Sequence, residues 1–179
     1  NELLWREFYK HILVGYPRVS RHRAFRLETE AVPWRHAPQE LAAWQEGRTG
    51  FPFVDAGMRQ LAETGWMHNR VRLVTGSFLT KNLRQHWRRG EEWFWDTLMD
   101  ADEASNPFNW QWVAGSGDDA APYFRIFNPI TQQEKFDPLG KYVTKWRPEA
   151  LLPGYPEPMV DVKESRKVAL AAYEDIKSV

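Results

Sequence analysis

Apolar residues recur every three or four positions over most of this chain, which is the period of an α-helix packed on one face. In residues 1–13, for example, Leu4, Phe8 and Ile12 follow this spacing. No segment shows the polar-apolar alternation that would favour a strand, so the sequence predicts an all-α fold. The predicted helices cover residues 1–13, 38–46, 52–64, 67–83, 91–99 and 162–176, with short helices over 132–146.

The stretch 100–112, DADEASNPFNWQW, breaks this pattern. Asp, Asn, Ser and Pro favour caps and turns over helix interiors, so we predict an ordered polar loop that delivers Trp110 and Trp112. An exposed indole leaves a large apolar surface in water, and two of them in one short loop favour a bound partner. The loop is therefore predicted to hold a flat, aromatic, hydrogen-bonding ligand.

Two of the predicted helices carry a face that mixes polar and aromatic residues. Glu2, Trp5, Arg6 and Tyr9 share one side of the first helix. An i,i+4 Glu2–Arg6 pair is most simply a surface ion pair, but Trp5 between the two charges favours a binding wall. The helix predicted over 67–83 has a comparable face made of Trp66, Asn69, Arg72, Leu73 and Gly76.

Composition removes several kinds of chemistry. There are 24 basic and 24 acidic residues and no Cys, which excludes disulfides and thiolate chemistry and fits a reducing compartment. The five His residues lack paired spacing, so no metal is predicted, and there is no Gly-x-Ser-x-Gly nucleophile motif. No apolar run reaches the length of a membrane span. Because the chain begins at Asn1 inside a predicted helix, we interpret it as a fragment of a longer protein.

The remaining candidate residues are aromatics, amides and ion pairs, which suit binding and electron transfer. Arg72 could pair with Asp100 or Asp102 across a planar ligand. Asn69 and Asn106 could meet ring nitrogens or carbonyls, because an amide both donates and accepts. From the residues alone, the ligand stays open between a nucleobase and a flavin.

Several composite motifs stand in order along nearly the whole chain. They are Thr49-Gly50-Phe51-Pro52, Asp55, Gly65-Trp66-Met67-His68-Asn69-Arg70, Asn109-Trp110-Gln111-Trp112 and Tyr123-Phe124-Arg125-Ile126-Phe127-Asn128-Pro129. This set resembles the DNA photolyase/cryptochrome family, and within it the class I cyclobutane pyrimidine dimer photolyases. The resemblance implies that residues 1–179 are the C-terminal part of the helical FAD-binding domain, without the antenna domain and the first part of the helical domain.

The resemblance also implies which side chains would hold FAD. Arg72 and Asp100 would form an ion pair beside the flavin, and Asp102 would accept from its polar edge. Asn106 would face flavin N5 and favour the reduced form. Further implied cofactor contacts are Arg6, Trp66, Asn69 and Trp112.

The implied substrate is a pyrimidine dimer flipped out of DNA, which needs aromatic surfaces to replace lost stacking. Implied contacts to its bases are Glu2, Trp5, Asn69 and Trp112. Arg70 would contact a phosphate, which positions DNA without reading its sequence. Leu73 departs from the family, whose dimer photolyases commonly carry Met at this position.

Three tryptophans match the chain that carries electrons from the protein surface to the flavin in this family: Trp110, Trp87 and Trp34. For Trp34 and Trp87, packing in the core is the simplest alternative interpretation. Indole is one of the few side chains with an accessible one-electron oxidation, so the two roles are compatible.

The implied activity is that of a deoxyribodipyrimidine photo-lyase, which uses light and electron transfer from reduced FAD to repair cyclobutane pyrimidine dimers. The resemblance further implies a second antenna chromophore in the parent protein and a monomeric, bacterial-type cytoplasmic enzyme that joins the nucleoid when bound to DNA. A cryptochrome-like photoreceptor for light signalling is the alternative. A folded fragment without activity is a third interpretation of the isolated chain.

Overall fold

The computed structural model describes residues 2–19, 23–118 and 124–176, apart from the side chains of residues 2, 19 and 151. Within these residues the regular structure is helical, and the one strand-like feature is an isolated bridge between Arg35 and Gln85. The all-α prediction is therefore confirmed. The α-helices are α1 (Glu2–Gly15), α2 (Pro38–Gln45), α3 (Pro52–Thr64), α4 (Asn69–Ser77), α5 (Trp87–Thr97), α6 (Ser105–Ala114), α7 (Pro129–Phe136), α8 (Lys141–Trp146) and α9 (Val162–Asp175). Short helical turns are η1 (Pro17–Val19), η2 (Leu27–Ala31), η3 (Phe78–Asn82) and η5 (Pro148–Leu151).

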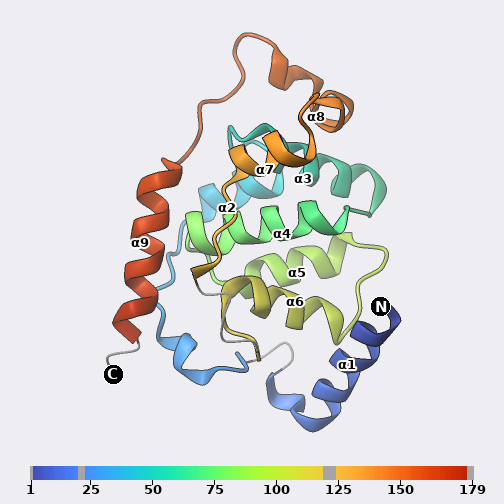
Figure 1. Ribbon diagram of the computed structural model, residues 1–179, viewed down its shortest axis with the longest axis vertical. Coiled ribbons are helices and arrows are strands. Elements are labelled where there is room, and N and C mark those ends of the chain that lie inside the picture. Colours follow the sequence, from blue (N-terminus) through green and yellow to red (C-terminus); the bar gives the residue numbers. More distant parts are fainter. Residues whose placement is uncertain (1, 20–22, 119–123, 177–179) are drawn as a thin grey trace.

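Three helices, α4, α5 and α6, lie one above another through the middle of the molecule (Figure 1). The α5 helix packs on α6, and α4 contacts both α3 and α6. At one end α7 and α8 pack on α3, and at the other end α1 contacts α6. The last helix, α9, runs along the side of the molecule and packs against η3. This arrangement leaves one side of α4 and α6 facing α1.

The α3 helix supplies much of the core and has clear sequence boundaries. Pro52 stands at its first position, where no backbone N–H is needed, and Gly65 ends it in the left-handed conformation with φ +67°. The inward-facing side chains of α3 are all buried, among them Val54, Met58 and Leu61.

The helix predicted over 67–83 is present, but in two segments of different pitch. After α4 the chain continues into η3, a π-helical turn that contains the fully buried Lys81. Its Nζ donates to the carbonyl of Ala114 at 2.8 Å and lies 3.8 Å from the ring centroid of Tyr173. Burial lowers the pKa of Lys81 to about 7. The π-helical turn thus joins α4 to the end of α6 and to α9.

Trp87, which precedes the helix predicted over 91–99, is the first residue of α5. The helix begins four residues before the predicted start at residue 91. Its N-cap is His86, whose Nδ1 accepts from the backbone N–H of Arg88 at 3.2 Å. Histidine is not among the residues that commonly cap helices, so the sequence pattern gave no start signal here.

The polar stretch 100–112 is a loop over its first residues and a helix thereafter, which corrects the prediction of a loop throughout. Oδ1 of Asp102 accepts from the backbone N–H groups of Ala104 at 3.0 Å and Ser105 at 2.7 Å. These bonds satisfy donors at the start of α6. Pro107 falls in the first turn, where its missing N–H does no harm. The turn-forming residues therefore start a helix.

The large apolar side chains differ in burial. Trp44 of α2 is fully buried, whereas Trp93 and Trp95 of α5 are partly exposed. On α1, Leu4 is 71% exposed and Phe8 is 42% exposed, so the apolar spacing of this helix does not correspond to a buried face among the described residues.

Candidate functional site

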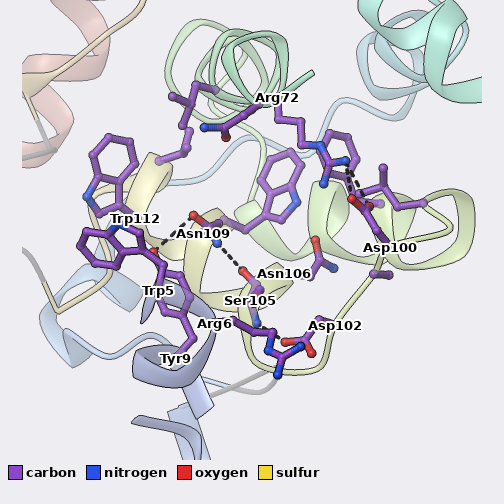
Figure 2. A pocket seen from close by; sticks show the side chains of 18 of the residues that line it. Trp5, Arg6, Tyr9, Arg72, Asp100, Asp102, Ser105, Asn106, Asn109 and Trp112 are labelled. Carbon is purple, nitrogen blue, oxygen red and sulfur yellow. Dashed lines mark hydrogen bonds and ion pairs between the residues drawn. The ribbon is translucent and has the colours of Figure 1, made fainter. Parts of the chain in front are cut away.

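A cavity of about 570 Å³ opens between α1, α4, α6 and the loop that joins α5 to α6. This volume lies in the range of pockets that bind cofactors and small ligands. Figure 2 shows Trp5, Arg6 and Tyr9 of α1 approaching from one side of the cavity, with Arg72 and Asp100 on the other. The stretch predicted to hold a ligand therefore faces a real cavity.

An ion pair between Arg72 and Asp100 forms one edge of this cavity (Figure 2). Nη2 of Arg72 donates to both carboxylate oxygens, at 2.8 and 3.1 Å. Its Nε donates to the backbone carbonyl of Met67 at 2.6 Å, so the guanidinium is held from two directions. Arg72 was predicted to pair with Asp100 or Asp102, and the structure selects Asp100. The side chains are 25% and 47% exposed, so the pair contributes little to folding stability.

Asp102 lines the same cavity, and its carboxylate also accepts from the backbone N–H groups at the start of α6. Partial burial raises the pKa of its carboxyl, but the backbone N–H groups of Ser105 and Ala104 outweigh burial and lower this pKa overall. The carboxylate is therefore ionised at neutral pH, and it contributes a negative charge beside Arg6, which also lines the cavity.

Asn106 is nearly buried at 8% exposure, and its amide has a fixed direction. Nδ2 donates to the backbone carbonyl and to the side-chain Oε1 of Glu91, both at 3.1 Å. Both partners are acceptors, so the NH₂ group must point toward Glu91. The amide therefore offers its oxygen, not its NH₂ group, to a ligand in the cavity.

Trp110 lies in a narrow slot between helices and contributes to the cavity wall. A Cβ added to Gly90 of α5 would lie 2.1 Å from the Trp110 ring, and one added to Gly76 of α4 would lie 3.5 Å from it. Phe94 and Trp44 pack edge-on against the same ring, at centroid distances of 4.9 and 6.1 Å. The indole is therefore held rigidly where α4, α5 and α6 meet.

Aromatic side chains form the opposite wall. Trp5 is 55% exposed and stacks on Tyr9 at a centroid distance of 6.0 Å. Burial and nearby negative charge raise the pKa of Tyr9, whose hydroxyl donates to Oδ1 of Asn109 at 3.4 Å. Trp112 lines the cavity from α6, with the Arg125 guanidinium 5.4 Å from its ring centroid. Flat apolar surfaces are thus available at the mouth of the cavity.

The other two tryptophans of the predicted electron chain lie outside this cavity. Trp87 is buried, whereas Trp34 is partly exposed. The imidazole of His86 contacts both, with centroid distances of 5.2 Å to Trp34 and 5.6 Å to Trp87. The Trp110 ring rests against Gly90, one turn of α5 after Trp87. These positions are compatible with core packing and with electron transfer.

The cavity brings together most of the predicted site residues. They are Trp5, Arg6, Asn69, Arg72, Asp100, Asp102, Asn106, Trp110 and Trp112. Trp66 is not among the lining residues; it is 42% exposed and packs edge-on against His68 at 6.2 Å. Arg70 also lies outside the lining, with its guanidinium 4.6 Å from the ring centroid of Phe136. The side chain of Glu2 lies outside the described residues.

Sequence reasoning missed several cavity residues on α6. Asn109 and Val113 line the cavity together with Asn106 and Trp110. These four residues follow an i, i+3, i+4, i+7 spacing, which places them on one helical face. That spacing was the available signal, and it was lost because the stretch was interpreted as a loop.

The described part of the chain holds no group of three His, Cys, Asp or Glu residues placed to bind a metal ion. Among its helices, none has both the length and the apolar character that crossing a membrane requires.

Comparison with known proteins shows the family. Residues 1–151 match the family model described as the FAD binding domain of DNA photolyase. The chain therefore belongs to the DNA photolyase family, as its motifs predicted. A curated relative from Escherichia coli (strain K12), named deoxyribodipyrimidine photo-lyase, is 50% identical over 97% of this chain. The match covers 41% of that relative, so the chain spans about two fifths of the length of such proteins.

Solved structures give the same picture. A class III photolyase from Agrobacterium tumefaciens has a TM-score of 0.93 and 47% identity, covering 99% of this chain and 42% of that chain. A cryptochrome from Synechocystis sp. PCC6803 has a TM-score of 0.87 and 35% identity, covering 96% of this chain and 40% of that chain. Because a class III photolyase is this similar, the finer assignment to class I stays a prediction.

The side chains around the cavity suit FAD. An isoalloxazine ring needs flat apolar contacts and a few fixed polar partners at its edge. Leu73 and Trp110 supply apolar surface, and the absent side chain of Gly76 leaves room beside α4. The Arg72–Asp100 pair and the fixed amide of Asn106 supply the polar partners. The donor set therefore fits a flavin, as the family model requires.

Proposed function

We propose that residues 1–179 form the C-terminal part of the helical FAD-binding domain of an enzyme that repairs cyclobutane pyrimidine dimers in DNA with light. The observation that carries this proposal is one cavity with a flavin-suited side and an exposed aromatic side. The photo-lyase names of the relatives support repair over the signalling alternative. When bound, FAD supplies light absorption and one-electron chemistry.

On the cofactor side, Asn106 is proposed to select the redox state. Its oxygen can only accept a hydrogen bond, because its NH₂ group is held by Glu91. The reduced isoalloxazine carries an N–H at N5 and the oxidised ring does not, so this amide favours the reduced form. Arg72 and Asp100 would lie beside the ring, with Asp102 and Arg6 nearer the polar part of the cofactor.

On the substrate side, Trp5 and Trp112 are proposed to stack against the flipped dimer. Both line the cavity, and Trp5 is exposed enough to meet a ligand. Base-aromatic stacking contributes about 1–3 kcal/mol per base. Asn69 would bond to the bases, and Glu2 is proposed to do the same from the first turn of α1.

Two further roles remain proposals. Arg70 would contact a DNA phosphate near the cavity. Trp110, Trp87 and Trp34 would pass electrons inward from the partly exposed Trp34 to the cavity, and the slot around Trp110 supports a fixed position for the inner member. A second light-harvesting cofactor is proposed for the whole protein; an archaeal relative from Sulfolobus tokodaii is described as holding two FAD molecules.

Repair is tested with the full-length protein that contains this chain. The photoreduced protein is illuminated with an oligonucleotide that carries one thymine dimer, and restored monomers are measured by chromatography. We expect light-dependent repair of the dimer. If no monomers are restored although flavin is bound and reduced, the proposed repair activity is wrong.

The substrate wall is tested by Trp5→Ala. We expect the Kd for dimer-containing DNA to rise by a factor of roughly 5–150, the equivalent of about 1–3 kcal/mol of stacking. Tyr16→Ala is the matched control, because Tyr16 is similarly exposed at 57% but lies beyond the end of α1 and outside the cavity lining. Equal affinities of the two variants would contradict the role of Trp5.

A further inference from the structure

His86 occupies a special position, at the N-cap of α5 and against two tryptophan rings. Its centroid lies 5.2 Å from that of Trp34 and 5.6 Å from that of Trp87. Nδ1 accepts from the N–H of Arg88 at 3.2 Å, and Nε2 lies 3.8 Å from Oε2 of Glu30. From these partners we assign the neutral ring, with its proton on Nε2. Protonation would add a proton at Nδ1 and break the bond from Arg88.

The charged groups around His86 come from two elements. Glu30 of η2 favours the protonated ring, whereas Arg88 and Arg89 of α5 oppose it. Burial is the largest influence and, with Arg88, lowers the pKa of His86 below its usual value. From α9, Tyr173 packs edge-on against the outer of the two tryptophans, and burial raises its pKa, so it stays uncharged. The imidazole is therefore neutral at neutral pH and gains a charge on acidification.

Among the described residues, Trp34 has no hydrogen-bond acceptor for its indole N–H, and this nitrogen, Nε1, is buried. When Trp34 loses an electron, no described residue is placed to take this proton at once, so the positive charge first resides on the ring. A charge on the adjacent His86 would then act on a cationic Trp34 through Coulomb repulsion.

We propose that neutral His86 permits positive charge to move outward from Trp110 to Trp87 and Trp34, and that protonated His86 prevents this movement. The proposal rests on the proposed electron transfer through these tryptophans. Trp87 gives one electron to oxidised Trp110, and Trp34 gives one electron to oxidised Trp87. A bound flavin would supply the first oxidant when it absorbs light. A thiol in solution would give one electron back to Trp34 and become a thiyl radical, and no bond to the protein forms or breaks.

A positive charge on His86 affects the two outer tryptophans, Trp34 and Trp87, to a similar extent. A cation on His86 lies at similar distances from Trp34 and Trp87, so it makes oxidation of both less favourable by a similar amount. Trp110 lies in its slot against Gly90, a turn of α5 away from the cap. The charge would therefore remain on Trp110 and recombine with the flavin.

The experiment measures flavin photoreduction in the full-length protein, with a thiol donor, from pH 8 to pH 5. We expect the wild-type rate to fall on the order of tenfold on acidification, with a midpoint below the usual histidine value of 6.5. His86→Asn keeps a good N-cap residue without the titrating ring, so it should show no such fall. His68→Asn is the matched control, because His68 caps α4 through the N–H of Arg70 at 3.2 Å but is exposed. Its profile should follow the wild type.

Glu30→Gln removes the carboxylate that favours protonation of His86. The NMR titration of the His86 ring, which needs neither light nor flavin, should therefore move to lower pH. The midpoint of the photoreduction profile should move in the same direction. A wild-type acid profile in His86→Asn, or an unchanged His86 titration in Glu30→Gln, would overturn the proposal. Absence of photoreduction in the wild type at pH 8 would instead overturn the electron chain itself, and this proposal with it.

Discussion

Replacing Gly90 by alanine tests how tightly α5 holds the ring of Trp110. An ideal Cβ at this position would lie 2.1 Å from Cη2 and 2.3 Å from Cζ3 of the indole. Carbon atoms in contact need about 3.5 Å, so the ring or the helix must shift by roughly 1.4 Å. Phe94 and Trp44 already pack against the ring, which limits its escape. Overpacking of this kind lowers the free energy of unfolding by about 1–3 kcal/mol. The higher helix propensity of Ala offsets about 1 kcal/mol of this loss.

We therefore expect Gly90→Ala to lower the free energy of unfolding by up to about 2 kcal/mol, measured as a shift of the urea midpoint, and to slow flavin photoreduction. For the unfolding measurement, Gly76→Ala is a control at the same ring, because its Cβ would meet Trp110 at an ordinary 3.5 Å and Val113 at 3.4 Å. Gly15→Ala, which meets nothing within 4 Å, reports helix propensity alone. If Gly90→Ala is as stable as Gly15→Ala, the slot is not rigid and the reasoning fails.

Three further substitutions test the cavity and the core. Asp100→Asn leaves Arg72 without its carboxylate, so the variant should retain less flavin through gel filtration. Its free energy of unfolding should change by less than about 1 kcal/mol, because the pair is partly exposed. Retention of as much flavin as in the wild type would contradict the cofactor contact. Asn106→Asp places an acceptor against two acceptors of Glu91, so we expect the free energy of unfolding to fall by about 1–3 kcal/mol. This loss should grow as pH rises through the raised pKa of the new carboxyl, which urea unfolding at several pH values would measure. Equal stability of the variant at pH 5 and pH 8 would argue against the fixed amide. Lys81 has a pKa of about 7 when folded and 10.5 when exposed, so the unfolded state binds more protons between these values and stability should rise with pH there. From pH 7 to pH 9 the free energy of unfolding should rise by about 2 kcal/mol at most, and Lys81→Met should abolish this rise. If the free energy of unfolding of the wild type and of Lys81→Met depends on pH in the same way, this lysine does not titrate as stated.

Helices whose ends carry clear start and stop residues could be predicted almost to the residue. The predicted helix over 52–64 coincides with α3, because Pro52 and Gly65 mark its ends by backbone geometry alone. The predicted helix over 162–176 likewise matches α9, which Asp161 caps through the N–H of Glu164. In both cases the local signal and the tertiary structure agree, so pattern alone was sufficient.

The helices that build the site could not be predicted as well, because their starts depend on unusual caps. The N-cap of α5 is an imidazole, His86, and the carboxylate of Asp102 satisfies N–H groups at the start of α6 from outside the helix. Local propensity therefore favoured turns where packing of α5 on α6 enforces helix. Family motifs still identified Asn106 and Trp110, because a motif match does not depend on secondary structure.

The contacts of α5 with α6 tie the orientation of the amide to the position of the ring. Asn106 and Trp110 are four residues apart on α6, and their partners Glu91 and Gly90 are adjacent on α5. The missing side chain at Gly90 lets α5 approach the indole, and the same approach brings both acceptors of Glu91 within 3.1 Å of the amide. A shift of α5 that relieves a larger residue at position 90 must therefore lengthen the bonds to Asn106. Substitutions at positions 90 and 106 should for this reason be non-additive, because one helix contact sets both the acceptor in the cavity and the ring beside it.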